Sequence, residues 1–181
     1  MSFETRKDMV RELVKPNGVY AEVGVFKGDF TLFLQETLKP SKLYAIDLFE
    51  GVTGSGDQDG NNFSYCNLDE THKMLYSKGI VTLKGDSSTV LKTLEDESLD
   101  MVYIDADHTY KAVLKDLEAA FSKVKNGGWI MGHDYQMNMS KARTEYDCSG
   151  LKQAVDEFCA NYHLSVQYLG MDGCVSYAIK K

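Results

Sequence analysis

The chain has 181 residues, the size of one domain, and its 43% hydrophobic and 26% charged residues are those of an ordinary globular protein. Its 27 acidic residues outnumber the 20 basic ones, giving a net charge of −7, and because such a surface repels a phosphate backbone we expect no nucleic-acid partner. No apolar run reaches the roughly 18 residues of a membrane span, and no apolar leader opens the sequence, so we expect a cytoplasmic protein without a membrane partner.

Short β-rich segments alternate with segments of helical periodicity through most of the chain. Strands are predicted at residues 19–25, 43–48, 80–83, 101–104 and 129–131, and helices at 3–14, 31–38 and 109–124. The last of these helices is expected to end at Asn126-Gly127-Gly128, a sequence typical of helix C-termini. The alternation predicts right-handed β-α-β units and therefore an α/β fold with an open, doubly wound sheet.

The C-terminal part departs from this alternation. After a helix predicted at 150–162, only four residues separate two β-rich segments at 164–169 and 174–179. A parallel crossover needs more chain than that, so these segments are predicted to form an antiparallel hairpin. The result is a mostly parallel, seven-stranded sheet in a single domain over residues 1–181. Segments 51–64 and 135–149 are predicted to be loops beyond strand ends, where such folds bind ligands.

The strand at 19–25 leads into a turn with the sequence Glu22-Val-Gly24-Val-Phe26-Lys-Gly28. Gly24 is predicted to allow a tight turn and a close approach of the backbone to a ligand, and Gly28 to let a helix start close to the strand. A dinucleotide-binding turn has a glycine at the position of Phe26, and Glu22 would repel a pyrophosphate but suits an amino group. An ordinary strand-to-helix turn with two glycines is the alternative.

Two further strand ends carry acids. Asp47 lies at the end of the strand at 43–48 and can accept hydrogen bonds from both hydroxyls of a ribose, although a surface aspartate is the alternative. Asp86 and Ser87 follow the strand at 80–83 and would lie beside an adenine. A cap on the next helix explains the same two residues without a ligand.

Together these segments resemble the class I S-adenosylmethionine-dependent methyltransferases over almost the whole chain. Glu-Val-Gly-Val-Phe-Lys-Gly followed by Tyr-Ile-Asp-Ala-Asp-His-Thr-Tyr is similar to the subgroup that includes macrolide-sugar O-methyltransferases. The resemblance implies a Rossmann-like methyltransferase fold, with the glycine turn holding the methionine part, Asp47 the ribose, and Asp86 and Ser87 flanking the adenine. The cofactor-binding residues that it implies are Glu22, Gly24, Phe26, Gly28, Asp47, Leu48, Asp86, Ser87 and Asp105.

Asp105 and Asp134 are expected at the tips of two neighbouring strands. Such a pair of hard oxygen ligands can hold Mg²⁺, which completes its shell with water and substrate oxygens. The metal-dependent catechol-type O-methyltransferases resemble this arrangement, and the resemblance implies His133 as a third ligand. Because imidazole is a softer ligand than an oxygen, Mn²⁺ or no metal also stays open. The alternative is that both acids cap the helices that follow them.

His108 stands three residues after Asp105, where the catechol-type pattern has a lysine that takes the proton from the substrate hydroxyl. A histidine can act as this base because its ordinary pKa is about 6.5. A structural histidine at the start of a helix is the alternative. His108 and Asp105 are therefore the candidate catalytic residues.

The sequence thus predicts an enzyme that transfers a methyl group from S-adenosylmethionine to a hydroxyl of a small molecule, with a divalent metal, Mg or Mn, assisting. Two other classes stay open on the same fold: an NAD(P)-dependent oxidoreductase and a non-catalytic ligand-binding module. The acceptor is not identified among sugars, phenols and other small molecules. A homo-oligomer also stays open.

Overall fold

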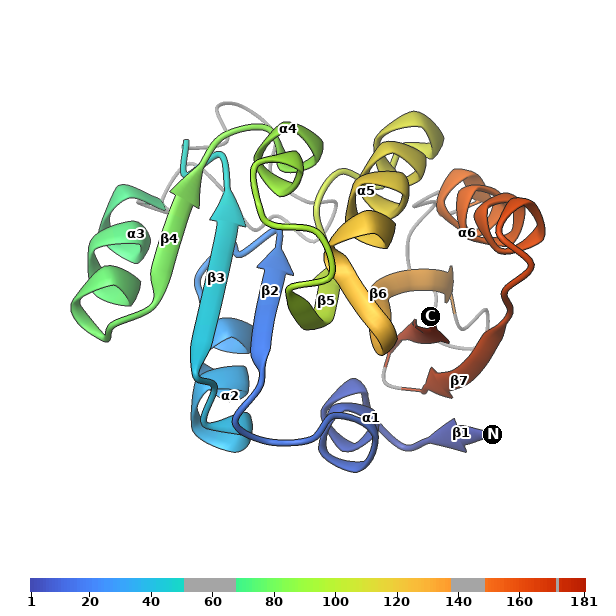
Figure 1. Cartoon of the computed structure of the whole chain (residues 1–181), viewed down its shortest axis with the longest axis horizontal. Coiled ribbons are helices and arrows are strands. Elements are labelled where there is room, and N and C mark those ends of the chain that lie inside the picture. Colours follow the sequence, from blue (N-terminus) through green and yellow to red (C-terminus); the bar gives the residue numbers. More distant parts are fainter. Residues whose placement is uncertain (51–67, 138–148, 172) are drawn as a thin grey trace.

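The computed structural model describes residues 1–50, 68–137, 149–171 and 173–181. Over these residues one eight-stranded sheet has the order β1-β7-β8-β6-β5-β2-β3-β4 (Figure 1). The strands are β1 (Ser2–Phe3), β2 (Val19–Val23), β3 (Lys42–Asp47), β4 (Val81–Lys84), β5 (Leu99–Ile104), β6 (Val124–Met137), β7 (Val166–Gly170) and β8 (Cys174–Lys180). The helices are α1 (Arg6–Leu13), α2 (Asp29–Leu38), α3 (Leu68–Ser77), α4 (Ser87–Lys92), α5 (Tyr110–Lys123) and α6 (Ser149–Asn161).

Helices cover both faces of the sheet and create two separate apolar cores. One core packs α1, α2 and α3 against the sheet, and the other packs α4, α5 and α6 against the opposite face. The strand residues alternate between them: Tyr20 of β2 belongs to the first core, whereas Ala21 and Val23 belong to the second. This alternation is the period of two that a strand imposes on its side chains, and it explains why β2 is apolar on both faces.

The central strands run parallel and end at one edge. Val23 of β2 is paired with Ile46 of β3 on one side and with Ile104 of β5 on the other. The residues that follow these partners therefore meet at the carboxyl edge of the sheet. β7 and β8 form the antiparallel hairpin predicted from the sequence, and β8 is also antiparallel to β6. The predicted α/β, doubly wound, mostly parallel fold is confirmed.

The N-terminal segment differs from the prediction of a helix over residues 3–14 in a seven-stranded sheet. Ser2 and Phe3 form an eighth strand, parallel to β7, and α1 begins only at Arg6. The reason is the cap at Thr5, which has extended backbone angles and accepts a hydrogen bond from the backbone N–H of Asp8 at 3.1 Å. Because a capping residue has extended rather than helical backbone angles, α1 cannot include Thr5 or the residues before it.

β6 also differs from the prediction. α5 ends at Lys123 rather than at the glycine pair, because Val124 is already extended and pairs with Leu99 of β5. Asn126-Gly127-Gly128 therefore lies within β6, where the pairing with β5 shifts register. β6 continues to Met137, so the loop predicted for 135–149 begins with strand. The rest of that loop, from 138 to 148, and the predicted loop at 51–64 lie outside the described residues.

None of the helices that the structure describes has both the length and the apolar composition that a membrane crossing requires.

Candidate functional site

Gly24 directly follows β2 and lies very close to the backbone of Asp105, which directly follows β5. Its φ is +83°, and a Cβ atom added there would lie 1.9 Å from the backbone oxygen of Asp105. The backbone N–H of Asp105 donates to the carbonyl of Val23 at 2.7 Å, and that of Gly24 to Ile46 at 2.9 Å. Gly24 thus permits a close approach of the backbone of Asp105. Its predicted approach to a ligand stays a prediction. Gly24 affects the site by fixing where Asp105 begins the next loop.

Asp47 organises the turn between β2 and α2. Its Oδ2 accepts hydrogen bonds from the backbone N–H groups of Val25 at 2.7 Å and Phe26 at 3.2 Å, and its Oδ1 accepts one from Phe49 at 2.9 Å. Beside this carboxylate, Phe26 has a φ of +50° and is 41% exposed, and Leu48 is 54% exposed. An acid and two exposed apolar side chains therefore share the carboxyl edge.

Glu22 is enclosed between β2 and α2. It is 2% exposed and accepts a short hydrogen bond from the hydroxyl of Thr31, which is also buried. Burial, together with the negative charges of Asp105 and Asp47, raises the pKa of Glu22 to about 8, against the smaller opposing effects of Thr31 and Arg6. The carboxyl is therefore mostly protonated at neutral pH. Gly28 is the N-cap residue of α2, as predicted for the start of a helix close to the strand. Its φ of +83° is one that glycine adopts readily.

Asp86 is the N-cap of α4, as the alternative interpretation of the sequence holds. Its Oδ1 accepts hydrogen bonds from the backbone N–H of Thr89 at 2.9 Å, the Thr89 hydroxyl at 2.7 Å and the Ser88 hydroxyl at 3.0 Å. The bonds from Thr89 and Ser88 lower the pKa of Asp86. Ser87 instead donates its hydroxyl proton to Oδ1 of Asp116 in α5 at 2.6 Å. Asp86 and Ser87 are therefore held firmly at the start of α4.

His108 lies between the two acids at the tips of β5 and β6. Its Nε2 is 3.5 Å from Oδ1 of Asp105 and 3.3 Å from Oδ2 of Asp134. On the other side, Nη1 of Arg6 is 3.1 Å from Oδ2 of Asp105. The Arg6 guanidinium also lies over the ring of Phe30, 4.7 Å from its centroid. The structure thus joins the predicted residues Asp105, His108 and Asp134, and adds Arg6 from α1.

The charges in this cluster stabilise one another. Burial lowers the pKa of His108, but the contacts with Asp105 and Asp134 and the charge of Asp107 outweigh it, so the pKa of His108 is raised. Burial raises the pKa of Asp105, but His108, His133 and Arg6 together lower it. Both shifts favour the charged forms, as expected for opposite charges at a partly buried site.

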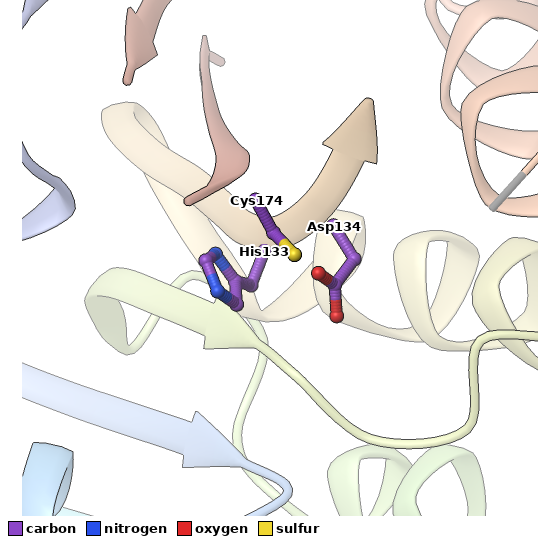
Figure 2. Close-up of side chains that lie close together, drawn as sticks. All are labelled: His133, Asp134 and Cys174. Carbon is purple, nitrogen blue, oxygen red and sulfur yellow. The ribbon is translucent and has the colours of Figure 1, made fainter. Parts of the chain in front are cut away.

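The metal ligands expected from the sequence were Asp105, His133 and Asp134, and the structure groups these residues differently. Among the residues that the structure describes, two sets of three have ligand atoms within 4.8 Å of one another: Asp105, His108 and Asp134, and separately His133, Asp134 and Cys174. Figure 2 shows the second set, with the three side chains gathered at the bend of β6 and the start of β8. Asp134 belongs to both sets, whereas His133 and Asp105 do not share one.

The bend in β6 explains this separation. The pairing with β8 passes from Gly132–Tyr177 to Gln136–Val175, so three residues of β6 lie opposite one residue of β8. Within this bulge Asp134 has a φ of +57°. His133 forms a 2.8 Å hydrogen bond through Nδ1 with the hydroxyl of Ser176, which also lies 3.0 Å from the hydroxyl of Tyr103. The bulge therefore directs His133 toward Ser176, whereas the next residue, Asp134, faces His108.

Several residues at this site could not be predicted from the sequence. Arg6, Thr31, Ser176 and Asp116 carry no motif, and they reach the site through packing between elements far apart in the chain. Cys174 could have been found, because it opens a predicted strand next to the strand that holds Asp134. Its position beside β6 follows from the register in which it pairs with Met137.

Comparisons with known proteins identify the family and the fold of this chain. A family model described as "Methyltransferase domain" matches residues 21–135, from within β2 to Tyr135 of β6. A curated relative, "Uncharacterized protein R132" of Acanthamoeba polyphaga mimivirus, is 25% identical over 138 residues. That match covers 75% of this chain, which spans only 60% of the relative.

Three solved structures share the fold. A SAM-dependent methyltransferase from Aquifex aeolicus has a TM-score of 0.65 at 17% identity, covering 98% of this chain and 90% of that one. The O-methyltransferase NovP has a TM-score of 0.70 at 19% identity, covering 97% and 79%. An rRNA methylase from Streptococcus thermophilus has a TM-score of 0.62 at 15% identity, covering 97% and 93%. Because the family model matches more than half of the chain, this protein belongs to the methyltransferase-domain family, and its fold is that of the class I S-adenosylmethionine-dependent methyltransferases.

Proposed function

We propose that this methyltransferase methylates a hydroxyl group of a small molecule and that His108 removes the hydroxyl proton. The observation that carries the proposal is the position of the His108 imidazole between Asp105 and Asp134 at the carboxyl edge of the sheet. A hydroxyl attacks a methyl group well only as it loses its proton, so a base at the acceptor is what this chemistry needs. The two carboxylates stabilise the imidazolium that forms.

The residues around the β2–α2 turn fit S-adenosylmethionine, which supplies an electrophilic methyl group on sulfur. Phe26 and Leu48 offer exposed apolar surface beside Asp47, which suits the flat ring of an adenine. A carboxylate has about four lone-pair sites, and three backbone N–H groups already use three of those on Asp47. Asp47 therefore has room for one further bond to a ribose hydroxyl, unless a turn bond opens to admit the second.

A divalent metal also fits the donor set, through Asp105, Asp134 and His108. Carboxylate oxygens with one imidazole suit Mn²⁺ better than Mg²⁺, and a metal so held would lower the pKa of a bound hydroxyl by Lewis-acid action. The same two carboxylates, however, face His108 in the structure. His108 therefore acts either as a ligand of the metal or as the base beside free carboxylates, and the two roles exclude each other.

Turnover by the purified chain tests both parts of the proposal. Transfer of a labelled methyl group is measured over a panel of sugars, catechols and other phenols, with total RNA as a separate acceptor. Transfer to RNA would contradict the proposal, and the net charge of −7 argues against it. Titration with S-adenosylhomocysteine and with NAD distinguishes methyl transfer from nicotinamide chemistry.

Two variants test His108 itself. His108→Ala is expected to retain binding of S-adenosylhomocysteine and to lose about 10² or more in turnover, the usual contribution of a general base. The matched control is His163→Asn, because His163 is exposed and its φ of +56° is one that asparagine tolerates. If His108→Ala stays within about threefold of the wild type, the assignment as base is wrong. Full turnover in excess chelator would show that no metal is needed, so that the two carboxylates act only on His108.

A further inference from the structure

An imidazole, a carboxylate and a thiol gather at the bend of β6, from His133, Asp134 and Cys174 (Figure 2). One ligand atom of each lies within 4.8 Å of those of the other two. Asp134 is 7% exposed, whereas His133 and Cys174 are half-buried, so the cluster is partly shielded from water but can be reached from it. Ligand atoms around one zinc ion lie about 3.4–3.6 Å apart, so side-chain movements of about 1 Å bring these three to a single ion.

Ser176 orients the ring of His133 from behind. Its hydroxyl lies 2.8 Å from Nδ1 of His133 and 3.0 Å from the hydroxyl of Tyr103, and both Ser176 and Tyr103 are fully buried. Ser176 can accept the proton of Nδ1 and donate its own to the Tyr103 oxygen, which leaves Nε2 of His133 with the lone pair that a metal needs. In metal sites the second ring nitrogen of a ligating histidine almost always has such a partner.

The types of donor in this cluster decide which metal it suits. Thiolate and imidazole are ligands that Zn²⁺ prefers, whereas Mg²⁺ requires oxygen ligands. We propose that His133, Asp134 and Cys174 bind a divalent cation of the zinc type, at a site separate from the set of Asp105, His108 and Asp134. Binding breaks the S–H bond of Cys174, forms a metal–sulfur bond and releases the proton to solvent. Cys174 thereby sets the preference for zinc over magnesium.

A metal at this site is compatible with His108 as the base. Asp134 has two carboxylate oxygens, and Oδ2 faces Nε2 of His108 at 3.3 Å. The other oxygen can therefore join His133 and Cys174 while the contact with His108 is kept. Three protein ligands leave the fourth position of a tetrahedral zinc ion for water or for an oxygen of a bound molecule. The proposal concerns metal binding alone, so it does not depend on which acceptor is methylated.

Cobalt spectroscopy of the reduced, metal-free full chain tests the site, because Co²⁺ can replace Zn²⁺ and its absorption reports its ligands. A thiolate ligand gives a charge-transfer band in the near ultraviolet, and four-coordinate Co²⁺ absorbs strongly in the visible range. The wild type is expected to show both bands with equimolar Co²⁺. An equimolar addition of Zn²⁺ should remove them, whereas excess Mg²⁺ should not.

Two variants distinguish a ligand from the residue that supports a ligand. Cys174→Ser should lose the near-ultraviolet band, because its side chain offers no thiolate. Ser176→Ala removes the partner of His133 and should weaken Co²⁺ binding about 10- to 100-fold while retaining that band at saturation. A purely structural role of Ser176 would lower the melting temperature but leave the affinity for Co²⁺ unchanged.

Matched controls locate the metal. Asp105→Asn alters only the other set and should leave both bands and the affinity as in the wild type. Cys159→Ser should do the same, because Cys159 is buried in the core on the side of α6. Bound Co²⁺ without a thiolate band, or a band that survives in Cys174→Ser, would overturn the proposal. So would a loss of affinity in Asp105→Asn as large as that in Cys174→Ser.

Alkylation tests the same site in the unaltered chain, so this result does not depend on how well a variant folds. The rate at which iodoacetamide modifies Cys174 is measured by mass spectrometry with and without Zn²⁺. At about ten times its Kd, Zn²⁺ should slow this reaction about tenfold, because only the unligated thiol reacts. Mg²⁺ at the same concentration should have no effect. Equal rates with and without Zn²⁺ would overturn the proposal.

Discussion

The guanidinium of Arg6 and the carboxylate of Asp105 form an ion pair at 3.1 Å across 99 positions of sequence. Both side chains are about one-quarter exposed, so water screens the pair only in part. The positive charge of Arg6 therefore acts on the same carboxylate that faces His108 and belongs to the proposed metal set.

Removing that charge should strengthen cation binding. Arg6→Met keeps an unbranched apolar chain over Phe30 but leaves Asp105 without its guanidinium, so the affinity for Mn²⁺ should rise severalfold. Arg11→Met is the control, because Arg11 also lies over a phenylalanine, Phe33, but pairs with Asp8 outside the site. Calorimetric titration with Mn²⁺ measures both. Equal affinities in the two variants would show that Asp105 takes no part in holding the metal.

Gly24 should tolerate no side chain. In Gly24→Ala the new methyl carbon would overlap the backbone of Asp105, and the expected loss of stability is at least about 3 kcal/mol. Gly127→Ala separates steric overlap from backbone strain: its φ is +80°, close to that of Gly24, but no atom lies within 4 Å of the added carbon. Its cost should be only about 1–2 kcal/mol. Urea unfolding measures the stability of both variants. Similar losses of stability would show that the overlap with Asp105 is not what excludes a side chain at Gly24.

Glu22 should make the fold less stable as the pH rises. Its pKa is about 8 in the folded chain and near its ordinary value of 4.5 in the unfolded chain. Between these values the unfolded state loses the proton while the folded state retains it, so the free energy of unfolding falls with increasing pH. Glu22→Gln removes this titration and can still accept the bond from Thr31. It should therefore match the wild type near pH 4 and exceed its stability near pH 8.

Denaturant unfolding across that range, in the absence of cofactor, measures the difference. Glu36→Gln, on the exposed side of α2, is the control and should follow the wild type at every pH. A constant difference between Glu22→Gln and the wild type would mean that the pKa of Glu22 is not raised in the folded chain.

Asp47→Ala should affect both binding and folding. Loss of the ribose contact should weaken S-adenosylhomocysteine binding more than tenfold. The same change leaves the backbone N–H groups of Val25, Phe26 and Phe49 without their acceptor, so we also expect a loss of about 1–3 kcal/mol in stability. Asp47→Asn retains one acceptor oxygen, so its affinity and its stability should lie between those of the wild type and of Asp47→Ala. Unchanged affinity in Asp47→Ala, measured by calorimetry, would exclude Asp47 from the ribose site.

The strand ends were predictable from the sequence, but the partners of the side chains there were not. Short β-rich runs, several of them apolar almost throughout, indicate which segments are strands, and the order of the chain then places Asp47, Asp105 and Asp134 at one edge. His133 and His108 show which part of the site could not be predicted. Both are near a strand tip in sequence, yet the bulge in β6 turns His133 toward Ser176, while His108 reaches both acids. A bulge and a positive φ at Asp134 leave no periodic signal.

The pairing of β2 with β5, which places Tyr20 beside Met101, has a consequence for how the chain folds. In the described part of the chain, β3, β4 and three helices separate these two central strands in sequence. Neither strand can therefore complete its hydrogen bonding until the intervening chain has been brought around. Contacts this distant in sequence slow folding, because the entropy of closing the loop is lost before the contact forms. During that delay β2 exposes an apolar edge to other chains. High protein concentration during refolding should therefore favour aggregation over the native sheet.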